Sequence, residues 1–145
     1  MHVWVIDDQP KDRLWAELTF AEHGGRVREF ASADAALTDF VRGSSSSGGA
    51  RDGAESAAGG CADVPTLIVA DMDMPGTTGL ELARRMRRAG YTGTFVVLTG
   101  NVDATNAPAV REAGADMLLF KPLTPKTAAG LLEAASRRRA QQSAA

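Results

Sequence analysis

Four apolar stretches of the sequence each end in a polar residue that can take part in chemistry. Residues 3–6 run into Asp7 and Asp8, residues 66–70 into Asp71, residues 95–98 into Thr99, and residues 117–120 into Lys121. If these stretches are neighbouring parallel strands, their carboxyl ends bring three acids, a hydroxyl and an ammonium to one edge of a sheet. These are the groups that a phosphoryl-transfer site needs.

The three acids require a positive partner. Clustered carboxylates raise one another's pKa unless a cation neutralises them, and ligands that are all oxygen favour Mg²⁺ over zinc or copper. A carboxylate can also attack a phosphoryl group in line, and catalysis then consists mainly of positioning and charge neutralisation. Thr99, Lys121 and a bound Mg²⁺ would supply that neutralisation.

Each of these residues has a simpler interpretation when it is taken alone. Asp7 and Asp8 precede Pro10 and could cap a helix, Thr99 could be an ordinary hydroxyl at a strand end, and Lys121 could be a surface lysine. Those interpretations do not explain why chemically useful residues follow four separate strands. The combination therefore favours one assembled site.

The elements needed to position these residues follow from the hydrophobic pattern. We expect strands at residues 3–6, 26–30, 66–70, 94–99 and 117–120, with a helix after each. Leu14 and Leu18 should face the core from the first helix, and Ser32 and Thr124 should cap the second and last helices, the last ending near Arg139. The alternation predicts an α/β fold, a doubly wound five-stranded parallel sheet of flavodoxin-like (βα)5 type with strand order 2-1-3-4-5.

Two segments depart from this regular pattern. Residues 43–63 are rich in glycine, serine and alanine, and we expect a flexible insertion with too little apolar surface to order itself. Pro108 would interrupt a helix that began at residue 103, so the fourth helix should start late, with Asn106 as its cap.

Composition limits the classes of function. The chain has 145 residues, 44% of them hydrophobic, with a formal net charge of −2, which argues against general affinity for nucleic acid. No apolar stretch approaches the roughly 20 residues of a membrane span, and the start does not resemble a secretory signal. We expect a single cytoplasmic domain over residues 1–141 with a tail at 142–145, and neither a DNA-binding domain nor a membrane span.

Taken together, the motifs resemble a known family. The Asp7-Asp8 pair, the stretch from Asp71 to Pro75 with Gly79 beyond it, Val97 to Gly100, Gly114 to Asp116 and Lys121-Pro122 resemble the response-regulator receiver domain of two-component signalling. The resemblance implies that Asp71 accepts the phosphoryl group, while Asp7, Asp8, Asp71 and the backbone carbonyl of Asp73 hold Mg²⁺. It also implies that Thr99 and Lys121 contact the phosphoryl oxygens.

One position departs from the family pattern. Receivers usually carry Tyr or Phe three residues before the lysine of the site, which is Lys121 here, and this chain has Leu118 at that position. An aromatic switch is therefore unavailable at that position. Together with Pro108 in the neighbouring helix, this is a departure from the family pattern on the usual output face of receivers, which runs from the fourth helix to the fifth.

Three functions are compatible with the sequence. The leading hypothesis is a phosphoacceptor signalling switch, not an enzyme, that is phosphorylated on Asp71 by a histidine kinase or a histidine phosphotransfer protein and acts on a downstream protein target. A phosphatase with an aspartyl nucleophile is an alternative because Asp71 and Asp73 form a D-x-D pattern, although Pro75 departs from it. A binding module that no longer depends on phosphorylation is the third.

Overall fold

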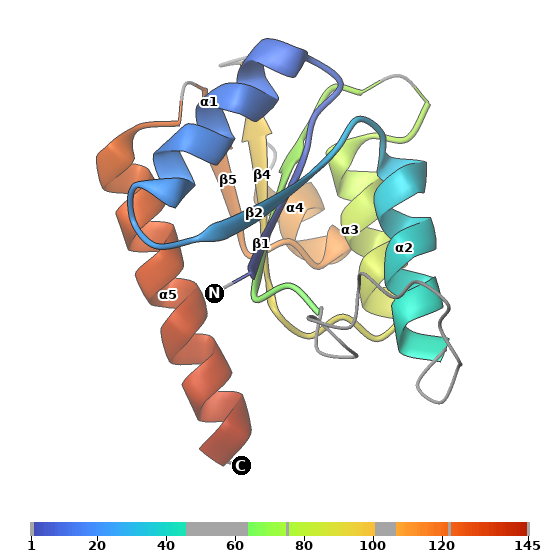
Figure 1. Ribbon diagram of the computed structural model, residues 1–145. Coiled ribbons are helices and arrows are strands. Elements are labelled where there is room, and N and C mark those ends of the chain that lie inside the picture. The colour runs from blue at the N-terminus through green and yellow to red at the C-terminus, as the bar shows by residue number, and fades with distance from the viewer. Residues whose placement is uncertain (1, 46–63, 75, 101–106, 122, 145) are drawn as a thin grey trace, which may run out of the picture.

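The computed structural model of the protein describes residues 2–45, 64–74, 76–100, 107–121 and 123–144, and these residues alternate between strands and helices (Figure 1). The strands are β1 (His2–Ile6), β2 (Arg26–Phe30), β3 (Leu67–Asp71), β4 (Thr94–Thr99) and β5 (Met117–Phe120). The helices are α1 (Pro10–Ala21), α2 (Ala33–Ser45), α3 (Gly79–Arg88), α4 (Ala107–Ala113) and α5 (Pro125–Ala144). The predicted order of elements is confirmed.

The strands form one parallel sheet in the order β2-β1-β3-β4-β5. A helix lies between each strand and the next along the chain. After β2, at one edge of the sheet, the chain returns to the other side of β1, where β3, β4 and β5 follow in order. β3 and β4 are buried along their whole length, as their continuous apolar sequence predicts for strands covered on both faces. The predicted flavodoxin-like topology is confirmed.

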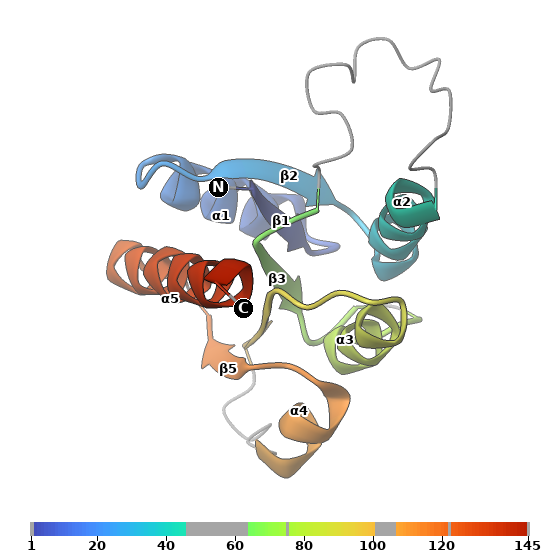
Figure 2. The same ribbon diagram turned by 90° about the horizontal axis from the view of Figure 1, so that it is seen from below.

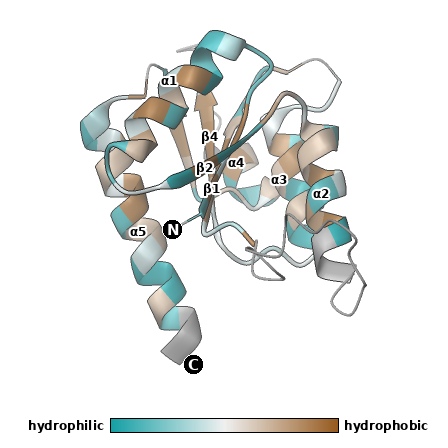
Figure 3. Cartoon of the chain, viewed as in Figure 1, coloured by the Kyte–Doolittle hydropathy of each residue, from teal (hydrophilic) through white to brown (hydrophobic). Residues whose placement is uncertain are grey.

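Helices cover both faces of this sheet. In Figure 2, α1 and α5 lie on one side and α2, α3 and α4 on the other. Successive residues of β1 alternate between the two resulting cores: Val3 and Val5 pack with α1 and α5, whereas Trp4 and Ile6 pack with α2 and α3. In Figure 3 the edge strand β2 is drawn mainly in the hydrophilic colour and β4 in the hydrophobic colour, and the helices carry both colours.

Several helix starts follow the local signals in the sequence. The Ser32 hydroxyl accepts a hydrogen bond from the Ala35 N–H at 3.2 Å, and the Thr124 hydroxyl accepts one from the Thr127 N–H at 3.1 Å. Pro108 is the second residue of α4, so this helix starts late, as predicted. The expected Asn106 cap lies outside the described residues.

The prediction for the buried face of α1 was wrong. Leu14 and Leu18 are 53% and 52% exposed, while Ala16 and Phe20 are buried. α1 carries two apolar stripes at the same helical spacing, and the stripe with the small Ala16 packs against the sheet and α5. The larger leucines are left on the outer surface.

Two helices extend further than expected. α2 continues to Ser45, so residues 43–45 of the predicted insertion are helical, and residues 46–63 lie outside the described part of the chain. α5 continues to Ala144, through residues 142–144 that were expected to form a tail. No glycine or proline follows Gly130, and alanine, glutamine and arginine are good helix formers.

Candidate functional site

The carboxyl ends of four strands meet at one edge of the sheet. Asp7 and Asp8 directly follow β1, Asp71 is the last residue of β3, Thr99 is the last residue of β4, and Lys121 directly follows β5. The strand register aligns these ends, because Ile6 pairs with Ala70, Asp71 with Leu98, and Thr99 with Phe120. The fold thus brings residues that lie up to 114 positions apart in the sequence to one place.

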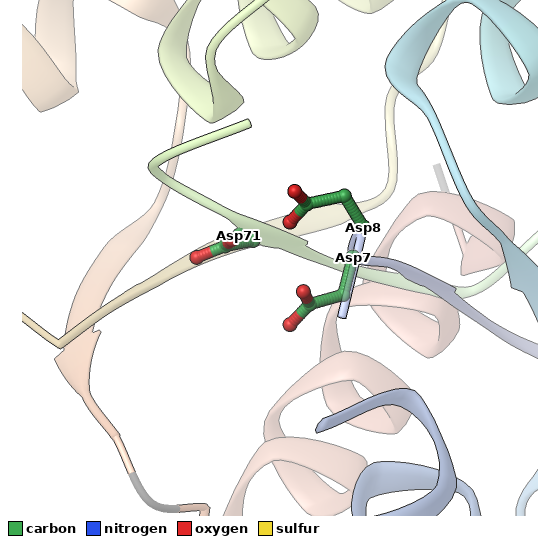
Figure 4. Close-up of side chains that lie close together, drawn as sticks. All are labelled: Asp7, Asp8 and Asp71. Carbon is green, nitrogen blue, oxygen red and sulfur yellow. The ribbon is translucent and has the colours of Figure 1, made fainter. Parts of the chain in front are cut away.

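The three acids form a compact cluster. Asp7, Asp8 and Asp71 each offer a carboxylate oxygen, and these oxygens all lie within 4.8 Å of one another (Figure 4). Asp7 and Asp71 are 4% and 5% exposed. The Oδ1 atom of Asp8 is buried and has no hydrogen-bond partner among the residues that the structure describes. A buried carboxylate oxygen without a partner, beside two more acids, fits a hard divalent cation such as Mg²⁺.

Burial disfavours the charged forms of these acids. It raises the pKa of Asp7, although the Gln9 N–H donates a hydrogen bond to its carboxylate at 2.9 Å and Lys121 lies beside it. Burial also raises the pKa of Asp71, and the negative charge of Asp7 raises it further. Lys121 alone therefore does not offset the burial of these acids, and a bound cation would supply further positive charge.

Lys121 is the ammonium of the site, and it contacts three carboxylates. Its Nζ atom lies 3.1 Å from Asp7 Oδ2, 3.1 Å from Asp71 Oδ1 and 2.8 Å from Asp12 Oδ2. Burial by itself would lower the pKa of Lys121, but the hydrogen bond to Asp12, the charge of Asp7 and the hydrogen bond to Asp71 outweigh it and raise the pKa above its usual value. Lys121 is therefore charged at neutral pH.

Sequence reasoning missed Asp12. It is the third residue of α1, and because this helix begins two residues after Asp8, its first turn lies at the same end of the sheet. The expectation that helix 1 begins at Pro10 would have been enough to place it near the other acids. Its pairing with Lys121 could not be inferred, because that contact joins α1 to the loop between β5 and α5.

The structure places Thr99 and Asp73 next to the cluster. Thr99 is fully buried, and its carbonyl accepts a hydrogen bond from the Lys121 N–H at 2.8 Å. Asp73 lies in the loop after β3, where its side chain is exposed and its backbone forms a hydrogen bond that lowers the pKa of Asp71. The roles predicted for the Thr99 hydroxyl and the Asp73 carbonyl stay predictions.

The start of α3 fixes the end of β3. The Gly79 N–H donates to the Met72 carbonyl at 3.1 Å, and the Met72 N–H donates to the Leu98 carbonyl at 2.7 Å. A Cβ atom on Gly79 would lie 2.5 Å from the carbonyl oxygen of Asp71. Glycine at this position therefore allows the helix to approach the backbone of Asp71 directly.

The sequence of the chain matches a known family. A sequence profile described as the response regulator receiver domain matches residues 42–133. The chain belongs to the response regulator receiver domain family. Receiver domains are signalling domains that bind Mg²⁺ at an acidic pocket, and the described part of this chain contains an acidic cluster of Asp7, Asp8 and Asp71.

Solved receiver structures have the same fold. A receiver domain protein from Clostridium thermocellum superposes with a TM-score of 0.77 at 21% identity, covering 97% of this chain and 98% of that one. The chemotaxis protein CheY4 of Vibrio cholerae superposes with a TM-score of 0.65 at 24% identity, covering 94% of this chain and 96% of that one.

Curated relatives are longer than this chain. The phosphate regulon transcriptional regulatory protein PhoB of Pseudomonas aeruginosa is 38% identical over 76 residues, which cover 51% of this chain and 33% of PhoB. The alkaline phosphatase synthesis transcriptional regulatory protein SphR of Synechococcus elongatus is 28% identical over 142 residues, which cover 98% of this chain and 51% of SphR. The chain thus spans between a third and about half of these two relatives.

The described residues contain nothing beyond the receiver fold. Every helix and strand in them belongs to the sandwich described above, without a separate DNA-binding unit. None of the helices in this part of the chain is both long and apolar enough to cross a bilayer.

Proposed function

We propose that the protein is a phosphoacceptor switch that receives a phosphoryl group on Asp71, in a Mg²⁺-dependent reaction, from a histidine kinase or a histidine phosphotransfer protein. The observation that carries this proposal is the contact between Lys121 and the Asp71 carboxylate, at 3.1 Å, beside two further acids at the same sheet edge. The single receiver domain over residues 1–141 is part of the same proposal.

The reaction can be written from the residues of the chain. A carboxylate oxygen of Asp71 attacks the phosphorus atom, the phosphorus–nitrogen bond of the phosphohistidine breaks, and the imidazole nitrogen keeps the bonding electrons. Asp71 then carries an acyl phosphate, whose oxygens Lys121 and the Thr99 hydroxyl contact. Mg²⁺ held by Asp7, Asp8, Asp71 and the Asp73 carbonyl would neutralise charge that builds on the phosphoryl oxygens.

The outer face of α1 is suited to partner docking. Leu14, Trp15 and Leu18 are 53%, 48% and 52% exposed, and they lie on the helix whose first turn holds Asp12. Exposed apolar side chains grouped beside a reactive site are typical of a protein interface. We propose that the phosphodonor protein covers this face when it delivers the phosphoryl group.

The output of the switch is the binding of a downstream protein target. Leu118, at the position where receivers usually carry an aromatic residue, is partly buried and packs against the core that contains α4. Readout therefore has to proceed without an aromatic ring at that position. A cytoplasmic location stays a prediction from the sequence.

The test is phosphorylation by a small-molecule donor. The wild type, Asp71→Asn and Asp34→Asn are incubated with acetyl phosphate and Mg²⁺, and their intact masses are measured. Asp34 is an exposed acid on α2, so Asp34→Asn matches the change in charge at a remote position. We expect the mass of one phosphoryl group to be added to the wild type and Asp34→Asn, to be absent from Asp71→Asn, and to disappear when EDTA replaces Mg²⁺.

Other outcomes would favour the alternative functions. Continuous hydrolysis of a generic phosphate monoester, lost in Asp71→Asn and Asp73→Asn, would favour an aspartyl-nucleophile phosphatase. A partner that binds the wild type and Asp71→Asn equally well, with no phosphorylation of either, would favour a binding module independent of phosphate.

A further inference from the structure

Lys121 has no spare hydrogen-bond donor in this structure. An ammonium group has three N–H donors, and its neighbours here are three carboxylates, on Asp7, Asp12 and Asp71. A phosphoryl oxygen can therefore bind Lys121 only by replacing one of them. The identity of the carboxylate that is replaced determines how easily Lys121 reaches the phosphoryl group.

Asp12 is the carboxylate that can leave at the lowest cost. It is 44% exposed, so water can solvate it once the ammonium moves away, whereas the side chains of Asp7 and Asp71 are only 6% and 5% exposed. It also makes the shortest of the three contacts, so it competes effectively for the ammonium until then. A cavity of about 80 Å³ lined by both Asp12 and Lys121 gives the lysine side chain room to move.

We propose that Asp12 is a positioning residue that restrains Lys121 and thereby slows phosphoryl transfer to Asp71. This inference rests on the proposed function of Asp71. Asp12 does not touch the reacting atoms. It holds one donor of Lys121 on the α1 side, and its negative charge also opposes the approach of an anionic phosphoryl donor.

The same pair links the reactive site to α1. Trp15, one turn after the start of the helix, donates a hydrogen bond from Nε1 to the Leu123 carbonyl in the loop that carries Lys121. When Lys121 exchanges Asp12 for a phosphoryl oxygen, one of these two ties between α1 and the loop is lost. Trp15 is therefore placed to report the exchange through its fluorescence.

The first experiment measures the rate of phosphorylation. Asp12→Asn removes the charge and keeps the size of the side chain, Asp12→Glu keeps the charge, and Glu22→Gln removes a charge at the exposed end of α1. We expect Asp12→Asn to react with acetyl phosphate about three- to tenfold faster than the wild type, which is the range expected for a partly exposed charged hydrogen bond. Asp12→Glu and Glu22→Gln should stay within about twofold of the wild type. An unchanged or slower rate in Asp12→Asn would overturn the proposal.

A second experiment does not depend on phosphorylation. A double-mutant cycle of Asp12→Asn and Lys121→Met measures their coupling in the free energy of unfolding, and Trp15 fluorescence follows beryllofluoride binding in a Trp4→Phe background. We expect favourable coupling and a fluorescence change on binding that is smaller in Asp12→Asn. Zero coupling between Asp12 and Lys121 would refute the restraint of Lys121 by Asp12, even if phosphorylation occurs. Favourable coupling in a protein that accepts no phosphoryl group would refute only the proposed role of Asp71.

Discussion

Replacing Gly79 with alanine should destabilise the protein, although helix propensity alone favours the opposite result. Alanine is a better helix former than glycine by up to about 1 kcal/mol. At Gly79, however, the new methyl group would lie 2.5 Å from the Asp71 carbonyl oxygen and 3.2 Å from the Met72 Cα atom. Because both neighbours are backbone atoms, α3 and the end of β3 have to move apart.

The size of the effect follows from this overlap. Real Cβ contacts essentially never fall below 3.0 Å, so the backbones must separate by roughly half an ångström, and overpacking of this kind costs about 1–3 kcal/mol. For a chain of this length, a loss of about 2 kcal/mol lowers Tm by roughly 5–8 °C. The movement also displaces Asp71, so Gly79→Ala should accept phosphate from acetyl phosphate more slowly than the wild type.

Gly130→Ala is the matched control. Gly130 is an exposed residue in α5, and a Cβ atom there would meet nothing within 4 Å. Urea unfolding followed by circular dichroism should show Gly130→Ala to be more stable than the wild type by about 0.5–1 kcal/mol. If Gly79→Ala were stabilised to the same degree, the close approach of α3 to Asp71 would be wrong.

Three further predictions concern charge. Because burial raises the pKa of Asp71, the native state binds protons more tightly than the unfolded state, so stability falls as pH rises above the unfolded value of 3.8. Without Mg²⁺, Asp71→Asn should therefore be more stable than the wild type at pH 7 by about 1 kcal/mol and lose this advantage near pH 4 in urea unfolding; an equal difference at both pH values would contradict the charge argument. Mg²⁺ at about ten times its Kd should stabilise the wild type by roughly 1.4 kcal/mol in thermal unfolding, and Asp8→Asn should abolish most of this gain; an undiminished gain would exclude Asp8 as a ligand. Arg87→Met should cost about 2–4 kcal/mol in urea unfolding, because Arg87 donates to the carbonyls of Gly114, Tyr91 and Gly93 as well as to Asp116; a cost below about 0.5 kcal/mol would show that these bonds are dispensable.

The sequence was sufficient to predict the fold and most of the site, because the relevant signals are local. Buried parallel strands appear as continuous apolar runs, and the residue that follows such a run must lie at the carboxyl edge of the sheet. Asp7, Asp8, Asp71 and Lys121 were located in this way. The caps at Ser32 and Thr124 were also correct, since the capping hydroxyl precedes the helix that it caps.

Contacts between distant segments were not predictable. The outward orientation of Leu14 and Leu18 depends on how α1 packs against α5, and the apolar spacing of α1 allowed two faces. In the sequence nothing distinguishes Arg87 from the neighbouring Arg85 and Arg88, but in the structure these two are exposed, whereas Arg87 is partly buried and joins α3 to the segments around β4 and β5. The pairing of Asp12 with Lys121 was not predictable for the same reason, because the two residues lie 109 positions apart in the sequence.

The position of the phosphoryl group on the chain tests the central claim most directly. After incubation with acetyl phosphate and Mg²⁺, borohydride reduces an aspartyl phosphate to an alcohol, and peptide mass spectrometry then identifies the modified residue. We predict that the modification is found at Asp71. Modification at Asp7 or Asp8 instead, or none anywhere in a folded protein, would contradict the assembly of these strand ends into a site that phosphorylates Asp71.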